Sequence, residues 1–110
     1  MAKESPFKIN IDANIFNEMG LKDLPEEKKN QMLTNMISII ATRVSARILD
    51  LLEEDDQKTF EELIDKGDNS AIEKFLRKKI PNFEKIIAEE SLLYKIQAIS
   101  EIKSFLETAK

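Results

Sequence analysis

Residues 32–52 read MLTNMISIIATRVSARILDLL, and this stretch decides the fold. It lies in a run from Pro25 to Glu53 that begins with a proline and has no glycine or proline inside. Apolar residues recur along the run at three- and four-residue spacing, which is the period of a helix with a buried face. A stripe this broad contacts two partners at once, so we expect the rest of the chain to cover it. The stripe consists of Leu33, Ile37, Ile40, Val44, Ile48 and Leu51, widened by Met32, Met36 and Ile39.

Start and stop signals predict four further helices around this long one. Glycines favour the left-handed conformation that ends helices, acidic residues suit helix starts, and a proline excludes helix from the residue before it. We therefore expect an all-α fold, a compact bundle of about five helices in which two long helices pack with three short ones. The four predicted helices cover residues 13–19 after a cap by Asp12, residues from the acidic run 53–56 to Lys66, residues from a cap at Asp68 or Ser70 to Ile80, and about 82–108. The last helix carries Leu92, Leu93 and Ile96 among its apolar residues, and we expect Ile96, like Ile40 of the first long helix, to lie in the middle of a buried stripe.

Residues 7–12 alternate between apolar and polar side chains, which is the period of a strand. The chain has no second strand candidate, so an internal sheet is not expected. One interpretation is an extended arm that lays Phe7, Ile9 and Ile11 on the helices. The other is an arm that pairs across a dimer. The expected organisation is an arm over residues 1–12 and a single helical domain over residues 13–110.

The composition narrows the classes of function. The 110 residues carry 17 basic and 21 acidic side chains, a formal net charge of −4, and no His or Cys. The missing cysteines exclude a disulfide scaffold and thiol redox chemistry. A protein that binds duplex nucleic acid usually has a basic excess, which this chain lacks. We expect no catalytic residues, no cofactor, no metal site and no enzymatic activity.

The expected location is the cytoplasm, without membrane association. The first residues, MAKESPFKINID, contain no apolar segment of the kind that forms a secretory signal. The longest apolar stretch is interrupted by Arg43, Ser45 and Arg47, which argues against a membrane span.

Arg43 and Arg47 interrupt the most apolar part of the chain and are four residues apart, so they share a helix face. A guanidinium in poorly solvated surroundings needs carboxylate partners. One interpretation is a pair of interhelical salt bridges or of arginines at the rim of the apolar face. The other is a site for an anion or for a carboxylate of a partner. If the long helices are antiparallel, the partner carboxylates come from Glu53, Glu54, Glu89 and Glu90.

A basic cluster precedes Pro81 and consists of Lys74, Arg77, Lys78 and Lys79, with Lys85 beyond it. Cations are favoured in the last turn of a helix, which is the simpler explanation, and a nucleic-acid patch is the alternative. Met19, Met32 and Met36 also allow two interpretations, because methionines at helical spacing either pack in the core or line an adaptable binding groove.

Several short motifs, taken in order, resemble those of a family of short, all-helical bacterial proteins, a domain of unknown function. They are the leucine-proline-acid start Leu24-Pro25-Glu26, Arg43-Val44 with Arg47-Ile48, the acidic run 53–56, Gly67-Asp68, Phe75-Leu76, and Ile80-Pro81-Asn82-Phe83-Glu84. The isoleucine-proline-asparagine-phenylalanine-glutamate motif is the most specific. The resemblance covers roughly residues 16–95. It implies a helical fold and transfers no activity.

The functional expectation is a small non-catalytic module for protein–protein interaction, with a second copy of the chain as one candidate partner. The alternative is a small regulatory factor that contacts nucleic acid through the basic cluster near Arg77. No motif in the sequence identifies the partner.

Overall fold

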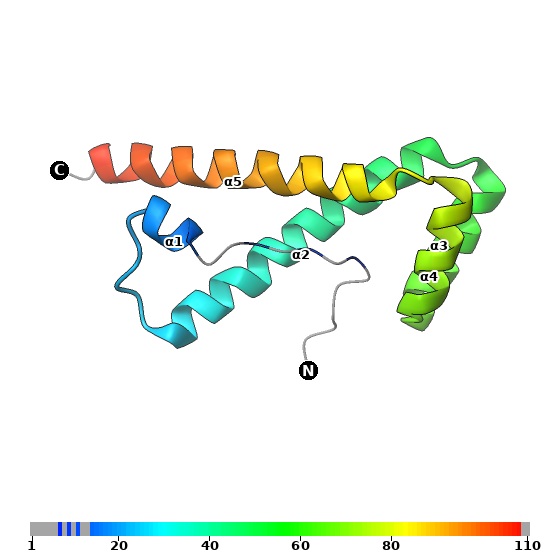
Figure 1. The fold of residues 1–110 in the computed structure, drawn as a ribbon, viewed down its shortest axis with the longest axis horizontal. Coiled ribbons are helices and arrows are strands. Elements are labelled where there is room, and N and C mark those ends of the chain that lie inside the picture. Colours follow the sequence, from blue (N-terminus) through cyan, green and yellow to red (C-terminus); the bar gives the residue numbers. More distant parts are fainter. Residues whose placement is uncertain (1–6, 8, 10, 12–13, 109–110) are drawn as a thin grey trace.

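In a computed structural model, residues 7, 9, 11 and 14–108 are described, and this part of the chain forms five α-helices and no strand (Figure 1). Helices take up most of the described residues, so the expected all-α fold with two long and three short helices is confirmed. The helices are α1 (Ile15–Glu18), α2 (Glu26–Leu51), α3 (Glu54–Lys66), α4 (Asn69–Lys79) and α5 (Phe83–Thr108).

The helix ends follow local chemistry. Pro25, expected at the first helical position, instead immediately precedes α2, a shift of one residue. Gly67 ends α3 with φ 70°, in the left-handed conformation that suits glycine. Of the two candidate caps for α4, Asp68 acts: its Oδ1 accepts a hydrogen bond from the amide of Ala71 at 3.1 Å. The cap predicted at Asp12 lies outside the described residues.

The two long helices form an antiparallel pair that converges where α2 ends and α5 begins, and diverges toward the other end (Figure 1). On α2 every fourth residue from Met36 to Ile48 is buried. Leu51, expected in this stripe, is 61% exposed, and Leu52 is buried in its place. The helix stops at Leu51, and the extended backbone of Leu52 turns that side chain into the core.

The short helix α1 lies between the diverging ends of the long helices, where Ile15, Phe16 and Met19 pack with Met36. The methionines Met19 and Met36 are buried and Met32 is half-buried, so they belong to the core and not to an open groove. Near the converging end, Phe7 and Ile9 of the arm are buried in the core that the long helices share with α3 and α4. The described arm residues therefore lie on the helices in the way that the first interpretation expects.

A hairpin of α3 and α4 closes the converging end of the pair (Figure 1). Phe60 of α3 is fully buried and stacks on Phe75 of α4, with ring centroids 6.3 Å apart. The side chain of Gln57 donates hydrogen bonds to the carbonyls of Leu49 and Leu52, at 2.7 and 3.2 Å. The carbonyl of Leu49 also accepts the amide of Leu52 at 3.2 Å, so Gln57 of α3 adds its hydrogen bonds to the cap at the end of α2.

The molecule is elongated, with extents of 52 × 27 × 18 Å and a radius of gyration of 16.1 Å. A compact domain of this length has a radius of gyration of about 13 Å. The bundle is thus more open than the expected compact one. The reason is that α2 and α5 diverge away from the end at which α2 stops and α5 begins (Figure 1).

Helix α2 is also long and apolar enough to span a membrane, judged by length and composition alone. Arg43 and Arg47 therefore do not exclude a membrane span by this criterion, contrary to what we expected from the sequence. Core helices of soluble proteins have the same properties, and the buried face of α2 packs on α5.

Candidate interaction surface

Arg47 bridges α2 to α5 through two carboxylates. Its Nη1 donates to Oε2 of Glu90 at 3.2 Å, and its Nη2 donates to Oε1 of Glu89 at 3.4 Å. The Glu90 side chain is only 12% exposed, whereas Arg47 and Glu89 are nearly half exposed. This arrangement matches the structural interpretation of Arg47, since an interhelical fork holds the pair in register.

Arg43 has different partners from those expected. Its Nη1 donates to Oε1 of Gln97 at 3.2 Å, and its guanidinium lies over the ring of Tyr94, 5.5 Å from the centroid. No ion pair joins Arg43 or Arg47 to the predicted partners Glu53 and Glu54 among the described residues. Those two acids lie at the end of the pair, where α3 begins, about one turn or more beyond Arg47.

The basic cluster is largely engaged by neighbouring acids. Arg77 contacts Glu73 at 2.8 Å and Glu84 at 2.9 Å, and Lys79 contacts Asp56 at 3.4 Å. The hydrogen bond that Arg77 donates to Glu73, followed by the one to Glu84, raises the pKa of Arg77 above its ordinary value. Lys74 and Lys78 are exposed on the same helix. The cluster therefore ties α4 to α3 and α5 and presents less free charge than its sequence indicates.

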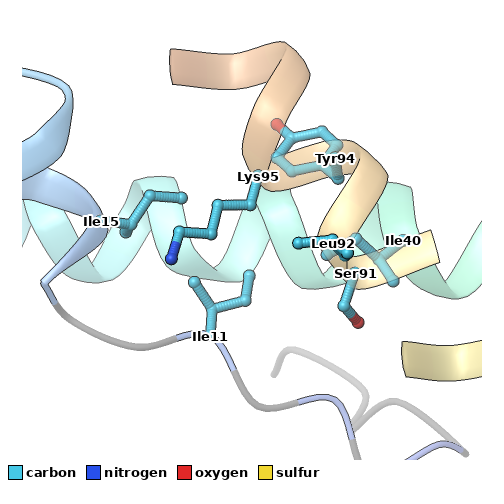
Figure 2. A pocket seen from close by; sticks show the side chains of 7 residues that line it. All are labelled: Ile11, Ile15, Ile40, Ser91, Leu92, Tyr94 and Lys95. Carbon is cyan, nitrogen blue, oxygen red and sulfur yellow. The ribbon is translucent and has the colours of Figure 1, made fainter. Parts of the chain in front are cut away.

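A small pocket of about 210 Å³ opens between the arm, α1 and α5, above the core residue Ile40 (Figure 2). Lys95 reaches over it, and its Nζ contacts Glu18 at 3.3 Å. The rest of the lining is mostly apolar and offers little specific chemistry. It consists of Ile11, Ile15, Ser91, Leu92 and Tyr94. In the described part of the chain, no group of three or more acidic side chains is placed to hold a metal ion.

The largest departure from the sequence analysis is on α5. Leu92, Leu93 and Ile96 are 58%, 55% and 57% exposed, although they belong to the apolar residues that were expected to cover the core from the last predicted helix. They share one side of α5, on which Leu92 also borders the pocket, and we call the three residues the outer stripe. The apolar residues of α5 point in nearly every direction around the helix, so their spacing does not distinguish the covered side from the exposed one. An apolar surplus of this kind is the signal that the sequence offered for an exposed patch.

The chain belongs to DUF5663, a family of proteins of unknown function, whose model matches residues 15–97. The expected resemblance to a domain of unknown function, over roughly residues 16–95, is confirmed to that extent. The match spans α1 to α4 and more than half of α5, including the outer stripe. No curated protein and no solved structure is significantly similar to the chain.

Proposed function

We propose that this protein is a small non-catalytic interaction module that binds a protein partner through the outer stripe of α5. The observation that carries the proposal is the exposure of three large apolar side chains, at 55–58%, on one side of a long helix. Soluble proteins seldom gather such side chains on their surface unless another molecule covers them.

Two properties of the chain support a non-catalytic role. It has no His or Cys, the residues that most often act as bases or nucleophiles near neutral pH. No polar or charged residue is fully buried among the described residues, which weighs against a site that prepares a side chain for proton transfer. The proposal assigns the role to the cytoplasm of a bacterial cell, as expected from the sequence.

The ion pairs of Arg77 and Lys79 weigh against the alternative of a nucleic-acid factor. Phosphate binding through the basic cluster would require these cations to exchange their present carboxylate partners. A gel-shift titration with mixed RNA and DNA tests the alternative, because phosphate contacts produce a steep dependence of affinity on salt. Tight, salt-sensitive binding that is lost in Lys74→Glu would favour it over our proposal.

Affinity capture with the immobilised full chain tests the proposal. We expect the parent to retain specific proteins from a native lysate and Ile96→Asp to lose them. The matched control is Leu51→Asp, which introduces the same charge at a leucine that is 61% exposed but lies at the end of α2. Equal capture by all three chains would show that the outer stripe binds no protein.

A further inference from the structure

The charges that flank the outer stripe identify one partner more closely. Besides Leu92 and Ile96, the same side of α5 carries two basic and two acidic residues, all exposed and three, four or seven residues apart. Such spacing places them in one line along a helix. We call this line the outer face, and it consists of Lys85, Glu89, Leu92, Ile96, Lys103 and Glu107.

The charges of the outer face are antisymmetric about Ile96. Glu89 lies seven residues before it and Lys103 seven residues after it. Lys85 lies eleven residues before it and Glu107 eleven residues after it. Each charge thus has an opposite charge at the same distance on the other side of Ile96.

We propose that the outer face binds a second copy of this chain, with the two α5 helices antiparallel around a two-fold axis at Ile96. The inference rests on the proposed function and names the partner. In this arrangement Glu89 meets Lys103 of the second copy and Lys85 meets its Glu107, and symmetry repeats each pair. A parallel arrangement would instead bring every charge against its own copy, and like charges across an interface oppose association.

The shape of the molecule allows this contact. Helix α5 forms one long edge of the molecule, and in this view the other described helices lie on one side of most of its length (Figure 1). Glu89 is bonded to Arg47 through Oε1 but remains 46% exposed, so it can accept a further cation. The outer face is about 33 Å long and one helix wide. An interface of that size is below the standard size of about 1,600 Å², so we expect a weak dimer whose population depends on concentration.

Sedimentation equilibrium of the purified full chain, from about 1 µM to 1 mM, tests the proposal. We expect a monomer–dimer equilibrium in the parent and a monomer throughout for Ile96→Asp, which places a carboxylate from each copy at the axis. Lys85→Glu and Glu107→Lys should each raise the dimer Kd on the order of tenfold, because each creates two like-charge contacts. The double variant restores opposite charges, so its Kd should return to within about twofold of the parent.

Lys74→Glu is the matched control, because it reverses one exposed charge on α4 and should leave the Kd unchanged. Circular dichroism of each variant checks that the fold is retained. Failure of the double variant to recover dimerisation, or a dimer that survives Ile96→Asp, would overturn the antiparallel arrangement.

The remaining outcomes separate this inference from the proposed function. If the parent is monomeric but still captures another protein through the outer stripe, self-association is wrong and the proposed interaction function is retained. A monomer that instead binds anionic phospholipid vesicles, with loss in Ile96→Asp, would overturn both. A monomer with neither activity would overturn both as well.

Discussion

Ile40 and Ile96 lie near the middle of the two long helices, and their sequence surroundings assign both to the core. The structure separates them: Ile40 is fully buried, whereas Ile96 is 57% exposed. Helix α2 is covered by α5, the arm and the hairpin, whereas α5 is covered on one side only. An apolar residue in the sequence favours burial at its position. Whether the residue is buried within one chain depends on how many other elements pack around its helix.

The largest expected loss of stability is at the buried residue of this pair, Ile40. Ile40→Asp should destabilise the fold by about 3–5 kcal/mol, because it places a carboxylate at a position of the core that is fully buried in the parent. That loss approaches the whole stability of a small domain. Thermal unfolding followed by circular dichroism measures it. A melting temperature equal to that of the parent would remove Ile40 from the core.

Arg47 lies at the edge of the contact between α2 and α5, and its loss should destabilise the fold less than Ile40→Asp does. Arg47→Ala should cost about 1 kcal/mol, at the low end for an interhelical pair because Arg47 and Glu89 are nearly half exposed. Arg47→Lys should recover only part of this, since an ammonium cannot bind two carboxylates in the same planar fork. Urea unfolding measures both. An Arg47→Ala protein as stable as the parent would favour a binding role for the arginine.

Arg43 should contribute less than Arg47. Arg43→Ala removes one hydrogen bond to the neutral Gln97 and the contact with the Tyr94 ring, so we expect a loss of about 0.5–1 kcal/mol. The same urea titration compares the two arginines directly. A larger loss for Arg43 than for Arg47 would contradict the difference in their partners.

The smallest effect on the monomer is expected on the outer side. At a protein concentration low enough to exclude association, Ile96→Asp should change the free energy of unfolding by no more than about 0.5 kcal/mol. Unfolding of Ile40→Asp and Ile96→Asp under identical conditions provides the contrast. If both variants unfold, the exposed position of Ile96 is wrong and α5 is covered on both sides.

Much of the fold can be predicted from sequence because its signals are local. Pro81 ends α4 by sterics with the preceding residue, Gly67 ends α3 by its left-handed backbone, and Asp68 caps the next helix. The capping bonds from Gln57 to the end of α2 could not be predicted in this way. They depend on the angle at which α3 leaves α2, which is set by packing.

The candidate site was predicted only in part. The spacing of Arg43 and Arg47 indicated one helix face, and their need for partners indicated the carboxylates of α5. The assignment of Glu89 and Glu90 to Arg47, and of Gln97 to Arg43, required the register of the two helices. Register is a property of the packed pair, because a shift by one turn would exchange these partners without changing either helix.

The sequence by itself determined the helical class, most helix ends, and the apolar surplus that a single chain has to hide. Those features follow from backbone sterics and from periodicity within a few residues. The tertiary structure alone decided which apolar residues are covered. Leu92, Leu93 and Ile96 have the same chemistry as the core residues Ile86 and Ile87, but the packed elements leave more than half of each of the three exposed. Burial is a relation between distant segments, so the outer stripe became visible only when the helices were placed together.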